Sequence, residues 1–169
     1  AGLVSNDSFQ LETAQCSALF GHIRGSFPHA ESDRLGLLQI CREGTVVIEN
    51  IEFLSPAVQE DLVHCINSGA FTPLGSKETI KTSARIIGTS TLSMAKLKEH
   101  EAMNDGLVEL LESSHLMVPS LRRRKKDLRL LVDFIIIQEC FKSPDRKLIK
   151  GMSDEAYQRI MGYDWPGNV

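Results

Sequence analysis

Two short β-branched segments with a helical pattern between them constrain the fold most strongly. Residues 45–48 read Thr-Val-Val-Ile, and residues 84–89 read Ala-Arg-Ile-Ile-Gly-Thr. Apolar runs of this length are typical of buried parallel strands. Between them, Ser55 and Pro56 form the cap and the first position of a helix. This strand–helix–strand order predicts an α/β fold with a parallel sheet and helices on both faces.

The chain continues with another helix and strand of the same kind. Residues 105–112 have a helical pattern, and residues 115–118 form an apolar run that ends at Pro119. We expect a helix and a third strand there, which would extend the alternation of helices and strands.

After Pro119 the character of the chain changes. A basic run is followed by a helical pattern from Asp127 to about Phe141, and a last short helix begins at Ser153. We therefore expect a domain boundary near residue 121. Residues 1–121 form the α/β part, and residues 122–169 form a small helical part.

Composition limits the class of protein. The chain has 169 residues with 19 basic and 22 acidic side chains, so its charge does not favour nucleic-acid binding by the whole chain. The cysteines Cys16, Cys41, Cys65 and Cys140 are far apart. They are interpreted as reduced core residues of a cytoplasmic protein, with a disulfide or a metal site as the alternative. No spacing indicates a metal site, and no apolar span is long enough for a membrane helix.

Five segments occur in the order of a known family. They are residues 19–30, 44–51, 85–87, 119–124 and the closing Trp-Pro-Gly-Asn-Val at residues 165–169. Together they resemble the AAA+ module of bacterial enhancer-binding proteins, the sigma-54-dependent transcription activators. Residues 1–18 match this family poorly.

The resemblance implies an architecture and partners. It implies a RecA-like three-layer α/β/α core with a parallel sheet, followed by a small helical lid. The family assembles into homo-oligomers, as dimers or rings, and acts on RNA polymerase holoenzyme. It binds DNA through a C-terminal domain, which would lie beyond Val169. In active members, ATP hydrolysis drives a loop against sigma-54.

The phosphate-binding loop of the family is not in this sequence. Such a loop needs a Gly-Lys pair to hold the outer phosphates, and no Gly is followed by Lys in this chain. We expect the first strand of the sheet and its Walker A loop to lie upstream of Ala1. The alternative is that the parent protein lacks them.

The Walker B and sensor positions are altered. The family's acidic pair after the Walker B strand falls on Glu49 and Asn50, and the sensor pair falls on Thr89 and Ser90. Glu49 can still serve a magnesium ion, but the amide of Asn50 cannot accept a proton from water. Loss of that base predicts hydrolysis about 10²–10⁴-fold slower. Alternatively, Glu49 and Asn50 cap the strand end and bind loop backbone.

The positions of the family's arginine fingers fall on Asn104 and Leu110. Neither can stabilise the charge of a transferring phosphate, a role worth about 10³–10⁵ in rate. A shift of the alignment does not restore a finger, because no arginine occurs between Arg85 and Arg122.

The sigma-contacting loop of the family, Gly-Ala-Phe-Thr-Gly-Ala, also differs. Its counterpart here consists of Gly25, Ser26, Phe27, Pro28, His29 and Ala30. Phe27 remains as an apolar anchor, whereas Pro28 lacks an N–H and His29 replaces a glycine. We expect productive sigma-54 engagement to be lost. His29 is either a pH-sensitive contact or a solvated loop residue.

The basic run has two interpretations. Arg122 and Arg124 either bind phosphates of a nucleotide, a cyclic dinucleotide or DNA, or they bond the core domain. The implied ligands are ATP or ADP with magnesium, and cyclic di-GMP.

These features together predict a regulatory AAA+-like domain of a transcription activator that hydrolyses ATP inefficiently. It would act by oligomerisation and by sensing a nucleotide or cyclic di-GMP. Two alternatives remain: an active sigma-54 activator whose Walker A loop lies outside these residues, and a plain protein-interaction module. No residue is assigned a catalytic role.

Overall fold

The computed structural model describes residues 2–5, 12–142 and 151–168. The chain divides into two compact units, residues 1–115 and residues 116–169. Each unit is described by itself.

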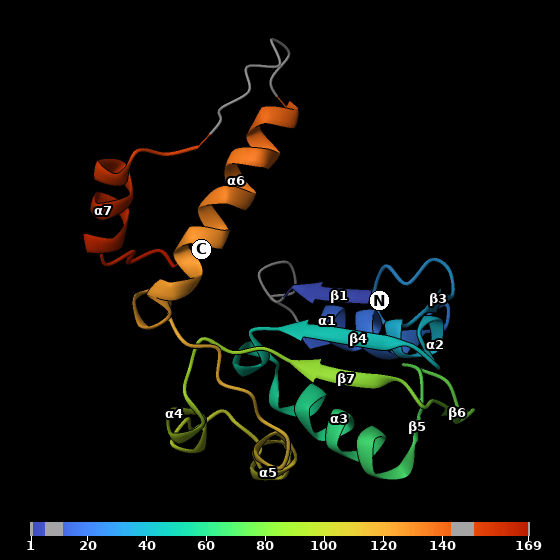
Figure 1. The fold of residues 1–169 in the computed structure, drawn as a ribbon. Coiled ribbons are helices and arrows are strands. Elements are labelled where there is room, and N and C mark those ends of the chain that lie inside the picture. Colours follow the sequence, from blue (N-terminus) through green and yellow to red (C-terminus); the bar gives the residue numbers. More distant parts are fainter. Residues whose placement is uncertain (1, 6–11, 143–150, 169) are drawn as a thin grey trace. The chain divides into compact units, whose positions relative to one another are not determined.

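A parallel sheet lies at the centre of the first unit (Figure 1). Strand β4, Thr45–Glu49, pairs with β1, Gly2–Ser5, on one side and with β7, Arg85–Gly88, on the other. Both pairings are parallel. The parallel sheet and the two strands expected near residues 45–48 and 84–89 are therefore confirmed, whereas β1 lies in a segment for which the sequence predicted no strand.

The crossover between β4 and β7 contains helix α3, Pro56–Ser68, after the short 3₁₀ helix η2, Ile51–Phe53. Ser55 caps α3, since its hydroxyl accepts a hydrogen bond of 3.4 Å from the N–H of Val58, and Pro56 occupies the first turn. This agrees with the cap and proline signal in the sequence. After α3, strand β5, Ala70–Phe71, pairs antiparallel with β6, Ile80–Lys81.

Helix α1, Glu12–Phe20, leads directly into a small antiparallel ribbon. The ribbon consists of β2, Gly21–His22, and β3, Arg34–Leu35, and helix α2, Leu37–Ile40, follows it. Gly21 has φ +83°, and a Cβ there would lie 2.5 Å from the carbonyl oxygen of Arg34. Only glycine therefore permits the two strands to approach so closely.

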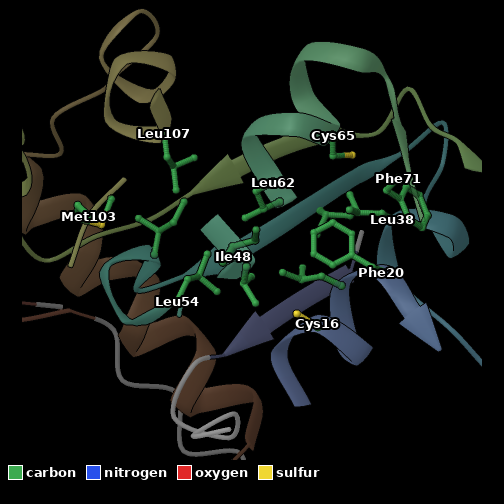
Figure 2. Close-up of a cluster of buried hydrophobic side chains, with 14 of the residues drawn as sticks. Cys16, Phe20, Leu38, Ile48, Leu54, Leu62, Cys65, Phe71, Met103 and Leu107 are labelled. Atoms are coloured by element: carbon green, nitrogen blue, oxygen red, sulfur yellow. The ribbon is translucent and has the colours of Figure 1, made fainter. Parts of the chain in front are cut away.

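In the core of this unit, apolar side chains of three helices pack against one face of β4 (Figure 2). Val46 and Ile48 have no exposed surface, whereas the alternate residue Val47 is partly exposed. The cluster also takes in apolar side chains from α1, α3 and α5, namely Cys16, Leu19, Phe20, Val58, Leu62, Cys65, Leu107 and Val108. The alternation along β4 defines which face of the sheet these helices cover.

The segment after β7 contains α4, Met94–Lys98, and α5, Asp105–Glu112. Helix α5 has the bounds that the sequence predicted. The strand expected at residues 115–118 is wrong: this segment has no strand structure, and Leu116 is 94% exposed. An apolar run forms a strand only beside a partner strand, and the described part of the chain provides none for it.

The second unit is helical. Two 3₁₀ turns, η3 at Leu121–Arg123 and η4 at Lys125–Asp127, precede helix α6, Leu128–Lys142, and helix α7, Asp154–Gly162, follows. The expected helices near 127–141 and 153–161 are confirmed, and the Ser153 hydroxyl caps α7 by accepting from the N–H of Ala156 at 3.3 Å. Among the described helices, none has the length and apolar character that a membrane span needs.

Two hydrogen bonds join the ends of this second unit. The N–H of Leu121 donates to Oδ1 of Asn168 at 2.8 Å, and Nζ of Lys125 donates to the carbonyl oxygen of Met161 at 2.7 Å. Asn168 belongs to the closing Trp-Pro-Gly-Asn-Val segment. That segment therefore closes the helical unit back onto its first residues.

Candidate functional site

The carboxyl ends of β4 and β7 bring the predicted Walker B and sensor positions together. Thr89 donates its N–H to Ile48 and accepts the N–H of Ile51, at 2.9 Å each. The backbone N–H of Asn50 also donates to the Thr89 hydroxyl at 3.4 Å. Adjacent parallel strands end at the same edge, so the two pairs of residues lie side by side as their sequence positions indicated.

Asn50 has a backbone conformation that most residues avoid. Its φ is 51° and its ψ is 59°, and it begins the turn that leads into η2. Asparagine tolerates this left-handed region better than most residues with a Cβ. Asn50 therefore has a conformational role at the strand end, which agrees with the alternative that it shapes the loop.

The described residues fit a magnesium–ATP centre poorly. Glu49 is half-buried and contributes one carboxylate of the kind that magnesium binds. Its neighbour Asn50 has no basic oxygen, and the Ser90 hydroxyl is engaged in its own turn, where it accepts from the N–H of Leu92 at 2.9 Å. No group of three or more potential metal ligands occurs in the part of the chain that the structure describes. We therefore assign no catalytic step to these residues.

The buried carboxylate of Glu52 was not singled out from the sequence. Glu52 is only 4% exposed, and its Oε1 accepts from the N–H and the hydroxyl of Thr91, at 3.3 and 3.2 Å. Its Oε2 has no hydrogen-bond partner among the described residues. An acidic residue within the otherwise apolar Ile-Glu-Phe-Leu segment was the available signal. Glu52 ties the turn after β4 to the loop after β7.

Asn104, one of the two predicted finger positions, is a helix cap. Its Oδ1 accepts from the N–H of Leu107 at 3.1 Å at the start of α5. Its own N–H donates at 2.8 Å to Oε1 of Gln59, a fully buried side chain that also donates to the carbonyl oxygens of Leu54 and Ala102. The amide of Asn104 is thus occupied by local structure.

Leu110, the second finger position, is on α5. It lines an apolar cavity of about 490 Å³ between α3, β7 and α5, together with Leu62, Ile66 and Ile86. An aliphatic side chain in this position has no charge to offer a phosphate.

The loop of residues 25–30 is closed by its own backbone. The N–H of Gly25 donates to Ala30 at 2.9 Å, and the N–H of Ala30 donates to Phe27 at 3.0 Å. His29 has φ 74°, a conformation that a glycine adopts without strain. The geometry thus supports the expectation that His29 replaces a glycine of special conformation.

The base of this loop packs on a buried polar pair. Nδ1 of His22 and Oγ of Ser17 share a hydrogen bond of 2.7 Å. The ring of Phe27 meets the His22 ring edge-on, with 4.8 Å between centroids and 67° between planes. Phe27 is therefore partly buried against β2 instead of projecting freely.

Two of the four cysteines that the sequence placed in the core are buried there, whereas Cys41 and Cys140 are only partly buried. Cys16 and Cys65 are buried, and burial raises the pKa of both thiols. The pKa of Cys16 reaches about 11, since the carboxylates of Asp61 and Glu12 add to the effect of burial. Both thiols therefore remain protonated at neutral pH, which makes them poor nucleophiles and poor metal ligands.

The basic run lies at the start of the second unit. Arg122 is exposed and Arg124 is partly buried, with its Nε lacking a hydrogen-bond partner among the residues described. Phosphate binding by Arg122 and Arg124 stays a prediction.

The central strand of the parallel sheet ends in an acidic residue, and hydroxyl residues follow the next strand. A helical unit comes after this sheet in the chain. These features together are typical of an AAA+-type module. Residues 7–117 match the family model of the sigma-54 interaction domain, and residues 122–169 match that of the AAA+ ATPase lid domain. The chain therefore belongs to the sigma-54 interaction domain family. The resemblance stated from the sequence is confirmed.

Curated relatives and solved structures agree with this family. The chain is 31% identical to nitrogen fixation protein AnfA of Azotobacter vinelandii, over 100% of the chain and 32% of AnfA. It is 31% identical to the transcriptional regulatory protein ZraR of Salmonella typhimurium, over 90% of the chain and 34% of ZraR. The structure of NtrX from Brucella abortus has a TM-score of 0.80 at 20% identity, over 99% of this chain and 36% of NtrX. The chain thus spans about a third of the length of these relatives.

Proposed function

We propose that this chain is a regulatory AAA+ module of a bacterial transcription activator in which ATP hydrolysis is weak. The observation that carries the proposal is Asn50. It stands where the family has the residue that activates water, and its left-handed backbone fits the turn rather than any role in proton transfer. An amide has no basic site for the proton of an attacking water.

The finger positions support the same conclusion. Asn104 is occupied as the cap of α5 and by its contact with Gln59, and Leu110 is aliphatic. A neighbouring subunit would therefore receive no cation from these positions. The module would then lack both the general base and the arginine finger. Each of these groups contributes about 10²-fold or more to the rate of ATP hydrolysis.

The loop of residues 25–30 supports a change in partner contact. Phe27 packs on His22, and Pro28 removes one backbone donor from the loop. A loop held in this way presents less apolar surface to sigma-54. We infer that the module does not drive sigma-54 remodelling and acts by positioning the parts of its parent protein.

The proposed partners follow from the family. They are a second copy of the module in a dimer or ring, RNA polymerase holoenzyme, and DNA through another domain of the parent protein. ATP or ADP with magnesium, or cyclic di-GMP, would serve as a ligand rather than a fuel. Arg122 and Arg124 are cations suited to phosphate, whereas Glu49 by itself supplies only one of the several oxygen ligands that magnesium needs.

An active ATPase is the second candidate, because Glu49 retains an acidic side chain at the end of β4. The variant Asn50→Glu in the full-length protein separates the two candidates. We expect weak phosphate release in the wild type and an increase of about tenfold or more in the variant, since a base contributes about 10²–10⁴. Asn50→Gln is the matched control and should leave phosphate release unchanged, because its amide also lacks a basic site. A wild-type rate near 1 s⁻¹, within the range of ordinary enzymes, that Asn50→Glu does not raise would contradict the proposal.

A further inference from the structure

The cavity under the loop of residues 25–30 has the chemistry of an anion site. Its volume is about 480 Å³, within the range of small-ligand pockets. It lies between α1, the β2–β3 ribbon and the loop. Its polar lining consists of Thr13, Ser17, His22, His29 and Arg34. None of the described residues that line it carries a carboxylate.

His22 and Arg34 face the cavity from opposite strands. They are direct partners in the antiparallel ribbon, so their side chains share one face. The guanidinium of Arg34 is always protonated, so this face of the ribbon carries a fixed positive charge beside the His22 ring. The register of the ribbon therefore favours a negatively charged ligand at this point.

The donors of this cavity are unused within the described part of the chain. The guanidinium of Arg34 and the ring of His29 make no hydrogen bond or ion pair there, and His22 uses only Nδ1, toward Ser17. When the Ser17 hydroxyl donates to Nδ1, the proton of the neutral ring is on Nε2. Ser17 thereby leaves His22 with a donor for a ligand.

The loop of residues 25–30 contributes an apolar ring and a residue with a left-handed backbone to the cavity. The ring of Phe27 lines the cavity against His22, and His29 reaches it from a left-handed backbone position. Strained loop residues with a Cβ often mark ligand sites. A ligand with both an anionic group and a small apolar body would satisfy these two sides.

We propose that this cavity binds a small organic anion, a carboxylate or phosphate held between His22 and Arg34, and that its occupancy holds the 25–30 loop against α1. The proposal goes beyond the weak-ATPase proposal and does not rest on it. The cavity differs from the strand ends at Glu49 and Thr89 in all of its lining residues.

Calorimetric titration of the full chain with phenyl phosphate and with benzoate tests the site, with benzyl alcohol as the neutral analogue. We expect one or both anions to bind and the alcohol not to bind; the stronger anion identifies the headgroup. Arg34→Gln should weaken binding by about tenfold or more, since a charge-assisted hydrogen bond is lost. Arg24→Gln is the matched control, because Arg24 is an exposed cation next to the same loop and outside the cavity lining.

Two outcomes would overturn the proposal. One is the absence of binding by either anion, and the other is equal weakening by Arg34→Gln and Arg24→Gln, which would indicate nonspecific charge attraction. Tryptic cleavage after Arg24 gives a separate readout of the loop. It should slow when the anion is added to the wild type and stay unchanged in Arg34→Gln. Binding without this protection would overturn the loop part of the proposal.

Discussion

The interior of the α/β unit and the edge where its strands end differ in what their side chains do. In the interior, Ile48, Leu62 and Gln59 have no exposed surface and hold the sheet to its helices. At the edge, Asn50 adopts a left-handed turn conformation and the side chain of Asn104 caps α5, so both residues serve the local backbone. The fold and the chemistry of an AAA+ module are therefore separable, since packing maintains the one and a few edge side chains the other.

The largest effect should come from the interior. Leu62→Ala removes a fully buried side chain between α3 and the sheet and is expected to lower the free energy of unfolding by about 2–5 kcal/mol. Urea denaturation followed by circular dichroism measures it. Leu130→Ala, at a side chain that is 74% exposed, is the control and should change little. Similar losses at both positions would contradict the contrast between buried and exposed sites.

Gln59→Leu should have the next largest effect. The buried amide makes three hydrogen bonds, and their loss leaves the carbonyl oxygens of Leu54 and Ala102 and the N–H of Asn104 without a partner. One unpaired buried group costs about 1–3 kcal/mol, and the contacts with Ala102 and Asn104 are only part-buried, so we expect a total loss of about 1–3 kcal/mol. The unfolding midpoint in urea should fall, and hydrogen exchange at α5 should accelerate. If Gln59→Leu were as stable as the wild type, the hydrogen bonds of Gln59 would not stabilise the start of α5.

The raised pKa of the Cys16 thiol predicts that the free energy of unfolding falls at alkaline pH. Burial, with Asp61 and Glu12, raises the pKa of the thiol from its ordinary 9.0 to about 11 in the folded chain. Between these values the unfolded chain loses the proton first, so stability is full below pH 9 and falls as the pH rises toward 11. Melting temperatures of the wild type and Cys16→Ala, measured across this range, should converge. Parallel curves would contradict the assignment.

The smallest effect should come from Asn50 at the strand end. Asn50→Gly keeps the left-handed conformation and should change stability by less than about 1 kcal/mol. Asn50→Val forces a β-branched residue into φ 51° and should cost about 1–2 kcal/mol. Thermal unfolding of the two variants provides the comparison. Equal stability would mean that the conformation of Asn50 does not matter for the turn.

The sequence predicted the parts of the fold that local chemistry determines. The Ser55 and Ser153 caps, the bounds of α5 and the strands β4 and β7 all follow from neighbouring residues. The expected strand at residues 115–118 failed because strand formation depends on a neighbour that the local sequence does not reveal. Strand β1 was missed for the same reason: its pairing with β4 is a long-range contact.

The candidate site was predictable only in part. Motif order predicted Glu49 and Asn50 as the Walker B pair and Thr89 and Ser90 as the sensor pair, and the structure shows that the ends of these two strands are hydrogen-bonded to each other. Glu52 and Gln59 were not assigned a role, since a buried polar side chain is recognised only when its partners from distant segments are known. The cavity beneath the 25–30 loop likewise depends on the His22–Arg34 register, which spans the loop.

The central claim is that the module binds a nucleotide without using it as a fuel. Its most direct test is calorimetric titration of the full-length protein with ATP and cyclic di-GMP, alongside phosphate release at saturating ATP. We predict binding of at least one ligand with phosphate release far below the ordinary enzymatic rate of about 1 s⁻¹. Turnover of ATP near that rate would contradict the account and show that the strand edge retains a working catalytic centre.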